Sequence, residues 1–401
     1  MDFEFDFDRE SPFQPGIPVF PDRFKGRQET IRKILRRANI IYKGEPQHFF
    51  LTGKRRMGKT SVADFVKDYL DYKKNMIGVY VSNKGNDSIE TLTNWIIEAL
   101  INELPHESRF EKAKKWFKDH VEYIEVKGNK VKFKADDELS RSFKNYFPDY
   151  LSEIYDEFPQ SQRNGMLIII DDINGLSDSR EFADWYKKLA DTLAVSNHYE
   201  LPVYFLLAGY PEKFDALVVQ EESFGSIFTY DYIDCLSDEE VSEFFTDTFK
   251  RVGMKISDEA LDVMVAFSSG LPLMMQQIGE SVFWACGSNN ITQKDALTGI
   301  INAANEIGLK QIRPILDKIN ETYEDILQNL ADNHLKTFKK EDVLDKLNIS
   351  EEVFEKFLVR MMELGMIESK GRRNSETYQF SNNLYYTYFL IKSFEKSRPI
   401  D

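Results

Sequence analysis

Short runs of apolar residues recur along the first 235 positions, and segments with helical spacing lie between them. In these segments apolar residues return every three or four positions, as they do over Ser61–Leu70 and Ile89–Leu104. The apolar runs have the length of buried strands and fall at five places: His48–Leu51, Ile77–Val81, Leu167–Ile170, Val203–Leu207 and Tyr230–Ile233. Strands that alternate with helices predict a parallel sheet that is covered on both faces. We therefore expect an α/β fold around a five-stranded parallel sheet.

Beyond residue 235 the strand-like runs stop. Residues 236–305 show helical spacing that is interrupted at Gly270–Pro272 and near Gly287. Further helices precede two strand-like runs near residues 366–380, and they are predicted at Tyr323–Asn333, Lys340–Leu347 and Glu351–Leu364. Three helices followed by a hairpin is the order of a winged-helix domain. The sequence thus predicts a core over residues 1–235, a helical lid over 236–305 and a winged helix over 306–401.

One segment of the core interrupts the alternation of strands and helices. Between residues 123 and 133, polar and apolar positions alternate on either side of Gly128 and Asn129, which predicts a β-hairpin. We expect this hairpin to belong to an insertion over about residues 105–160. It is either a structural insertion or an edge on which a partner protein docks. The first eight residues alternate acidic residues with phenylalanine, which suits a flexible tail or a partner-binding strand.

A glycine-rich loop follows the first predicted strand. Gly53, four further residues, and then Gly58, Lys59 and Thr60 form the pattern G-x-x-x-x-G-K-[ST] between that strand and a helix, which is the context of a phosphate-binding loop. Backbone N–H groups must turn inward around a phosphate, and we expect both glycines to supply conformations that only glycine adopts cheaply. The helix points its positive dipole end at the anion. A chance glycine-rich turn would lack these flanking elements, so the pattern predicts nucleotide binding.

A pair of acids marks the end of the third predicted strand, where the apolar run reaches Asp171 and Asp172. A carboxylate at the tip of a buried strand beside a phosphate loop is placed to hold magnesium through water. We assign that role to Asp171 together with the Thr60 hydroxyl, and the orientation of the attacking water to Asp172. Lys59 brings a mobile positive charge to the β- and γ-phosphates. The alternative is that the acids only cap the strand end.

The amino-acid composition disfavours several classes of binding partner and site. The 401 residues carry 52 Lys and Arg against 67 Asp and Glu, a net charge of −15, which disfavours non-specific attraction to nucleic acid. The charge is uneven, because residues 22–74 around the phosphate loop hold 15 Lys and Arg against 6 Asp and Glu. Two cysteines, and five histidines without metal-ligand spacing, argue against a disulfide framework or a zinc site. No apolar run reaches the ~18 residues of a membrane span, and the acidic N-terminus is unlike a signal peptide, so we expect a cytoplasmic protein.

Four motifs occur in the order found in one known family. They are F-K-G-R at residues 24–27, G-K-R-R-M-G-K-T-S at 53–61, I-I-I-D-D at 168–172 and G-L-P at 270–272. The chain resembles the archaeal-type AAA+ ATPases, a branch of the P-loop signal-transduction (STAND) ATPases that is related to replication initiators. The resemblance covers nearly the whole chain, including the winged helix, and the R-R-x-G-K-T-S loop is its most discriminating part. It implies ATP and Mg²⁺ as cofactors, and a slow ATPase that acts as a switch.

The resemblance also implies which residues serve the nucleotide. Lys59 and Asp172 are the expected catalytic residues, and Thr60 and Asp171 are the expected magnesium ligands. The residues expected to bind the nucleotide come from the N-terminal motif near the adenine, the phosphate loop and the lid turn: Phe24, Gly26, Arg27, Gly53, Lys54, Arg55, Arg56, Met57, Gly58, Lys59, Thr60, Ser61, Gly270 and Pro272.

Three positions depart from the family pattern. Asp172 stands where many relatives have glutamate, Tyr210 stands where a small polar sensor residue is expected, and residues 221–228 hold no arginine where an arginine finger would be sought. A finger is worth roughly 10³–10⁵ in rate, so its absence implies slow turnover unless a partner or another subunit supplies one. Arg55 and Arg56 follow the family. They either neutralise the γ-phosphate or pair with acids of the lid or the winged helix.

The predicted recognition helix of the winged-helix domain, residues 350–365, is acidic. Its outward groups include four glutamates against two cations: Glu351, Glu352, Glu355 and Glu363 against Lys356 and Arg360. Residues 320–401 hold 12 Lys and Arg against 15 Asp and Glu, whereas DNA-reading modules are usually basic. We therefore expect this domain, or the insertion hairpin, to bind an unknown protein partner. The cations of Lys370–Arg373 on the wing leave DNA binding as the alternative.

Two other functions are alternatives to an ATPase switch. One is an ATP-regulated DNA-binding initiator, and the other is a scaffold that keeps its nucleotide bound. A nucleotide-dependent oligomer fits the family.

Overall fold

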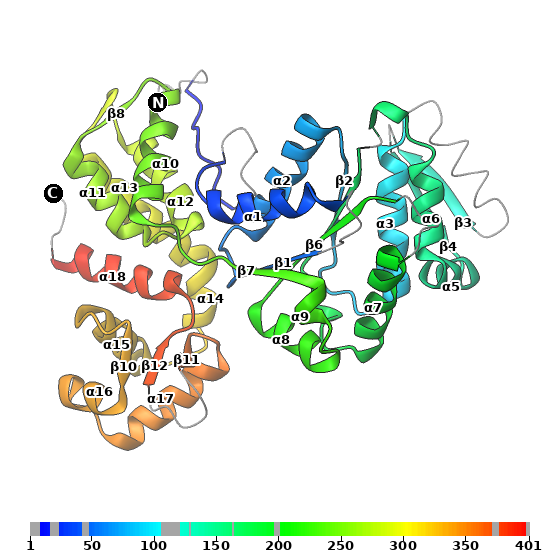
Figure 1. Cartoon of the computed structure of the whole chain (residues 1–401). Helices are drawn as coiled ribbons and strands as arrows, with labels where there is room; N and C mark the ends of the chain where they lie inside the picture. The colour runs from blue at the N-terminus through cyan, green and yellow to red at the C-terminus, as the bar shows by residue number, and fades with distance from the viewer. Residues whose placement is uncertain are drawn as a thin grey trace. The chain divides into compact units, whose positions relative to one another are not determined.

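The chain is organised in two compact units (Figure 1). The computed structural model describes residues 9–16, 24–41, 48–105, 121–127, 130–162, 164–195, 201–370 and 377–397. The core unit is Val19–Asp234, and the C-terminal unit is Cys235–Asp401 together with Met1–Pro18. No helix in the described ranges combines the length and the apolar character that crossing a bilayer requires.

A parallel sheet organises the core unit. In their order across the sheet its strands are β2 (Ile77–Ser82), β5 (Met166–Asp171), β6 (Val203–Gly209), β1 (His48–Thr52) and β7 (Phe228–Tyr232). Every neighbouring pair is parallel, which confirms the five predicted strands. The central strands β5, β6 and β1 are buried along their whole length, so they read as continuous apolar runs. The loop after β1 and the acids that end β5 open on the same edge of the sheet, with β6 between them.

Helices cover both faces of this sheet (Figure 1). On one face lie α1 (Gln28–Ala38) and α2 (Lys59–Lys74), and the Tyr204 hydroxyl of β6 donates to the Ile34 carbonyl of α1 at 3.3 Å. The other face builds one continuous apolar core with the helices of the later segments: α3 (Ile89–Glu103), α5 (Asp137–Asn145), α6 (Phe147–Tyr155), α7 (Arg180–Val195), α8 (Pro211–Gln220) and α9 (Phe224–Ile227).

His48 begins β1 inside this core. Its ring is fully buried, and its centroid lies 5.8 Å from that of Tyr186 and 5.1 Å from that of Phe205. Burial lowers the pKa of His48 to about 3, so the ring is neutral, and Nδ1 accepts a hydrogen bond from the Phe205 amide at 3.2 Å. His48 is therefore a packing residue.

The predicted hairpin is confirmed as a separate two-stranded sheet. Its strands β3 (Val121–Lys127) and β4 (Lys130–Ala135) pair antiparallel, and α3 and α5 contact β4. The expected turn residues Gly128 and Asn129 lie outside the described part of the chain. The hairpin thus extends the helical layer of the core unit, and its use as a docking edge stays a prediction.

The first part of the C-terminal unit is helical, as predicted. Its elements are α10 (Asp238–Arg251), α11 (Asp258–Ser268), α12 (Pro272–Ala285) and α13 (Gln293–Ile307), with a short parallel pair of β8 (Lys255–Ile256) and β9 (Asn290–Ile291). Gly270 breaks the helices because its φ is +65° and a Cβ there would lie 2.2 Å from the Leu236 carbonyl oxygen. Pro272 occupies the first turn of α12, where the missing N–H removes no helical hydrogen bond.

The remaining elements follow the winged-helix order. The predicted helices are α15 (Glu321–Asp332), α16 (Lys340–Leu347) and α17 (Glu351–Glu363), and an antiparallel sheet contains β10 (Thr337–Lys339), β12 (Thr377–Phe380) and β11 (Ile367–Ser369) in that order. A π-helical turn (Gly308–Ile312) and α14 (Arg313–Leu316) connect α13 to this part. The wing residues Arg372 and Arg373 lie outside the described ranges. The sequence pattern did not single out α18 (Asn383–Ser397), which follows the sheet.

Helix α18 contacts both α13 and α15 within the C-terminal unit. Lys392 donates to Asn305 Oδ1 of α13 at 3.0 Å. On α15, Gln328 Nε2 donates to the Phe389 carbonyl at 3.0 Å. The helices α10–α13 and the elements from α15 to α18 therefore share one compact unit.

The N-terminal strap, residues 9–16, runs along α12. The Arg9 guanidinium donates to the carbonyls of Phe283 and Cys286 at 2.6 and 2.7 Å, at the C-terminal end of α12 where a cation is favourable. Toward the start of the helix, the Gln14 amide donates to Gln276 Oε1 at 2.8 Å. The strap therefore lies antiparallel to α12 and contacts it near both ends.

Phe13 anchors this strap, and we expect Phe13→Ala to destabilise the C-terminal unit by about 3–5 kcal/mol. Its ring is 3 % exposed, lies 4.8 Å from the Phe249 centroid and would be 2.2 Å from a Cβ on Gly279. Urea unfolding of the full chain, followed by circular dichroism, measures the loss. Tyr72→Ala is the control, because that side chain is 78 % exposed. A Phe13→Ala variant as stable as the wild type would show that the strap is not part of the unit's core.

Candidate functional site

The phosphate loop, residues 53–58, joins β1 to α2. Gly58 is the N-cap of α2 with φ +86°, which glycine adopts without strain, and Lys59 begins the helix. Gly53 is needed for a different reason than predicted: its φ is not left-handed, but a Cβ there would lie 2.6 Å from the Ile233 carbonyl oxygen, just after β7. Arg56 has φ +69°, a conformation that costs a non-glycine residue about 1–2 kcal/mol. Left-handed residues in a short loop are typical of backbone anion cradles.

Lys59 folds back onto the loop. Its Nζ donates to the carbonyls of Gly53 and Lys54 at 2.6 and 3.0 Å and lies 5.1 Å from the centroid of the Tyr210 ring. Burial lowers the pKa of Lys59, and the negative charge of Asp171 opposes that shift most strongly. The amine is thus held by loop carbonyls near acids, on a flexible stem that can turn toward a phosphate.

Thr60 and Asp171 meet across the edge of the sheet. The Thr60 hydroxyl donates to Asp171 Oδ2 at 2.6 Å, and the Tyr80 hydroxyl of β2 donates to the same oxygen. Asp171 is 8 % exposed. Burial, followed by the charge of Asp171, raises the pKa of Tyr80, so the phenol stays protonated and keeps donating. A hydroxyl in contact with a carboxylate offers the oxygen ligands that Mg²⁺ prefers.

Asp172 lies in a tight turn directly after β5. Its backbone is left-handed with φ +58°, and its amide donates to Asp171 Oδ1 at 2.9 Å, which fixes the two acids relative to each other. Its own carboxylate accepts a hydrogen bond from Asn174 Nδ2. The Tyr210 amide donates to Asn174 Oδ1 at 3.1 Å. Asn174 therefore links the Asp172 carboxylate, which is expected to orient water, to the backbone at the end of β6.

The N-terminal motif contacts the phosphate loop. Arg27 donates from Nη2 to the Met57 carbonyl at 3.2 Å, and also to the Asp234 carbonyl. Phe24 packs on Phe65 of α2 with ring centroids 4.9 Å apart. The structure thus brings Phe24 to α2 and Arg27 to the loop. Their assignment as nucleotide contacts stays a prediction.

The other predicted residues of the loop and the N-terminal motif differ in exposure. Arg55 is exposed, whereas Gly26, Lys54, Arg56 and Ser61 are half-buried. The Met57 side chain is 2 % exposed, so it contributes backbone atoms to the loop. Burial raises the pKa of Tyr210, and the positive charges of Arg55 and Arg56 oppose this rise.

Gly270 and Pro272 belong to the C-terminal unit, where they shape the turn before α12. The close approach of Leu236 and the first-turn position of the proline account for both residue types. Their assignment as nucleotide contacts stays a prediction.

The sequence did not predict two residues of the site, Tyr80 and Asn174. Asn174 follows the acidic pair by two positions, and a polar residue so close to the pair is the signal that could have identified it. Tyr80 alternates with buried positions of β2, and nothing in its own segment marks it.

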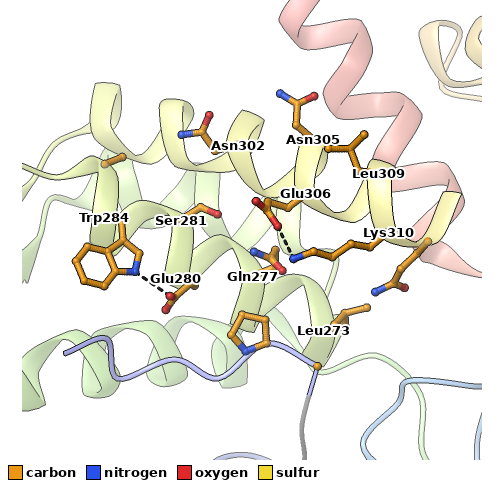
Figure 2. Close-up of a pocket in the computed structure, with 14 residues that line it drawn as sticks. Leu273, Gln277, Glu280, Ser281, Trp284, Asn302, Asn305, Glu306, Leu309 and Lys310 are labelled. Atoms are coloured by element: carbon orange, nitrogen blue, oxygen red, sulfur yellow. Dashed lines mark hydrogen bonds and ion pairs between the residues drawn. The ribbon is translucent and has the colours of Figure 1, made fainter. Parts of the chain in front are cut away.

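Two hollows lie away from the phosphate loop. One, of about 690 Å³, is on the C-terminal unit between residues of the strap, α12 and α13. Figure 2 shows Trp284 Nε1 donating to Glu280 and Lys310 paired with Glu306 in its wall. The other, of about 370 Å³, lies between α1 and α2 and has Tyr69 in its lining. Neither of these two hollows is lined by a residue of the phosphate loop.

Solved structures share the fold of this chain. No family model and no curated protein matches the sequence. The Walker-type ATPase PABY2304 of Pyrococcus abyssi aligns over 91 % of this chain and 96 % of its own, with a TM-score of 0.54 and 16 % identity. The ORC2 protein of Aeropyrum pernix, solved as ADPNP–ADP complexes, aligns over 95 % of this chain and 97 % of its own, with a TM-score of 0.57 and 11 % identity. The chain thus has the α/β P-loop fold of these proteins, which confirms the resemblance to archaeal AAA+ ATPases at the level of the fold.

Proposed function

We propose that this chain is an ATP-binding molecular switch with slow, Mg²⁺-dependent hydrolysis of ATP. The observation that carries the proposal is the contact of Thr60 with Asp171, 2.6 Å apart in space and 111 residues apart in the sequence. A chance glycine-rich turn would not place its threonine hydroxyl on the acid that ends a second strand. Lys59 and Asp172 lie beside this pair, so the residues expected for phosphate, metal and water meet at one edge of the sheet.

Each residue has a role that its position supports. Lys59 would turn from the loop carbonyls to the phosphates, and α2 would direct the positive end of its dipole at them. Thr60 and Asp171 would hold Mg²⁺, which neutralises phosphate charge. Asp172 would orient the attacking water. Mg²⁺ is usually held by one or two carboxylates together with substrate phosphates, so we expect the ion to bind together with the nucleotide.

Slow turnover is expected from two features of the sequence. Residues 221–228 supply no arginine, and Tyr210 replaces a small polar residue at the end of β6. A slow ATPase spends most of its time in one nucleotide state, which suits a switch. Since lid and winged-helix elements share one unit, we propose that a change at the lid turn is passed to the winged helix.

The test is to measure equilibrium ATP binding and phosphate release by the full chain, with and without Mg²⁺. Tight binding with slow release that chelation abolishes would support the proposal. Tight binding without any release would favour the scaffold that keeps its nucleotide. Absence of both would overturn the proposal.

Arg56→Ala is expected to weaken ATP binding more than ADP binding. The half-buried Arg56 adds positive charge to the phosphate loop, so its charge should count most where the γ-phosphate adds negative charge. Loss of one charge-assisted hydrogen bond corresponds to about 1.5–3 kcal/mol, or roughly 10- to 150-fold in ATP affinity. Titration with both nucleotides measures it, with Arg55→Ala at the exposed neighbour for comparison. Equal losses for ATP and ADP would favour an interdomain or structural role.

The outward face of α17 supports a protein partner rather than DNA. Two of its cations already form ion pairs within the helix, Lys356–Glu352 at 2.7 Å and Arg360–Glu363 at 3.1 Å. Two apolar side chains, Val359 and Met362, are 57 % and 44 % exposed. Phosphates would have to displace carboxylates from these cations, whereas exposed apolar groups beside carboxylates suit a protein surface with apolar and basic groups.

A DNA-binding initiator regulated by ATP is the second candidate, and the winged-helix order of α15–β12 is the observation that favours it. The full chain can be titrated with duplex DNA at low and moderate salt. Sub-micromolar binding with a steep salt slope, lost in an Arg372→Ala, Arg373→Ala variant, would favour the initiator. Weak binding that is the same for variant and wild type would favour the protein-directed switch.

A further inference from the structure

Asn174 connects two parts of the site that lie on different strands. Its Nδ2 donates to Asp172 at the end of β5, and its Oδ1 accepts the amide of Tyr210 at the end of β6. The amide group of Asn174 thus makes one hydrogen bond as a donor and one as an acceptor. Position 210 is also where this sequence lacks the small polar side chain expected beside the acids.

The packing around Asn174 holds it in this place. Ile173 is fully buried, and its carbonyl accepts the Ser177 hydroxyl at 3.0 Å. A Cβ on Gly175 would lie 2.3 Å from the Asn86 carbonyl oxygen, so the turn is pressed against the loop that follows β2. The turn cannot shift without moving the backbone of a neighbouring strand end.

The end of β6 is equally close to Asn174. A Cβ on Gly209 would lie 3.4 Å from Asn174 Oδ1 and 3.0 Å from the Ile173 side chain. Tyr210 is the N-cap of α8, so the amide that Asn174 accepts is one of the donors that a helix start leaves without a helical partner. The Tyr210 ring lies 5.1 Å from Lys59 Nζ. Contacts therefore run without a break from Lys59 through Tyr210 and Asn174 to Asp172.

We propose that Asn174 is a positioning residue for hydrolysis, which holds the Asp172 carboxylate in register with the end of β6. Family members have a small polar side chain at the position of Tyr210, beside the acids. In this chain Asn174, from the turn that follows the acids, would supply that polar group. The inference rests on the proposed function, because it takes Asp172 to orient the attacking water. A carboxylate held by a fixed amide keeps one orientation, and misplacement of a reacting group by about 1 Å can cost roughly 10²-fold in rate.

Two variants separate the two hydrogen bonds of Asn174. Asn174→Ala removes both, whereas Asn174→Asp keeps an acceptor for the Tyr210 amide but has no donor for Asp172. We expect both variants to lower kcat by about 10- to 100-fold and to leave the Kd for ATP within about threefold of wild type. In the chain without nucleotide, hydrogen exchange of the Tyr210 amide should be faster in Asn174→Ala and remain slow in Asn174→Asp.

Asn94→Ala is the matched control, because Asn94 of α3 donates to the Ser140 hydroxyl at 2.8 Å and contacts no residue of the phosphate loop or the acidic turn in the hydrogen bonds of the described chain. Wild-type kcat in Asn174→Asp would overturn the inference and leave Asn174 as a cap of α8. Unchanged Tyr210 exchange in Asn174→Ala would overturn the geometry. If Asn174→Ala fails to fold, Asn174→Asp alone decides. A wild-type chain that binds no ATP or releases no phosphate overturns the proposed function and this inference together, whereas unchanged variants of an active chain overturn this inference alone.

Discussion

Lys59→Ala is expected to abolish tight binding of ATP while the chain stays folded. Lys59 is the cation at the start of α2, and its Nζ is held by two loop carbonyls rather than by apolar packing. Two charge-assisted hydrogen bonds to phosphate oxygens are worth about 3–6 kcal/mol together, which is roughly 10²–10⁴-fold in affinity. The carbonyls of Gly53 and Lys54 can bond to water once the amine is gone, so the fold should lose little.

Equilibrium binding of labelled ATP measures this loss, and circular dichroism shows whether the variant is folded. Lys187→Ala is a suitable control, because it removes a surface lysine that pairs with Asp191 at 2.7 Å on α7. Wild-type affinity in a folded Lys59→Ala variant would contradict the assignment of the phosphate loop.

Asp172→Asn should keep ATP binding and lose hydrolysis. The substitution preserves the size of the side chain and the left-handed turn, since asparagine adopts positive φ as readily as aspartate does. It removes the negative charge that would orient and polarise the attacking water. Loss of such a group typically costs about 10²–10⁴-fold in rate.

Single-turnover phosphate release is the appropriate measurement, because it separates hydrolysis from product release. Asp178→Asn serves as the control: Asp178 lies a few residues further along the same segment and pairs with Lys213 at 2.6 Å. Unchanged release in Asp172→Asn would move the catalytic role to another group, and Asp171 would be the next candidate.

Local sequence patterns predicted the five strands and the phosphate loop. The five strands were recognisable because each is a short apolar run, and the phosphate loop because its glycines, lysine and threonine are consecutive. Gly58 behaves as predicted, with positive φ. Gly53 does not, because the constraint on it is the Ile233 carbonyl, which lies 180 residues away in the sequence and cannot be read from the loop.

The contacts that escaped prediction join residues far apart in the chain. Tyr80 and Asp171 are separated by 91 positions, and Arg9 and Cys286 by 277. A tyrosine on a strand or an arginine near a terminus has many partners open to it, and only the packing of the sheet or of α12 selects one. Helix α18 was not predicted because its tyrosines and phenylalanines are spread around the helix and leave no clear polar face. Several helices of its unit pack against it, which explains this lack of a polar face.

The strap also determines the order in which this protein can fold on the ribosome. Residues 9–16 are made before the core unit, but their partners at α12 follow more than 260 residues later, which takes tens of seconds at about 5–20 residues per second. The core unit is contiguous in sequence and can fold during that interval. The aromatic cluster around Phe13, in contrast, can close only after α12 has emerged, and closing so long a loop is slow. Nascent chains that stop before residue 285 would therefore carry a folded core unit with Phe13 exposed, a state that chaperones and proteases recognise.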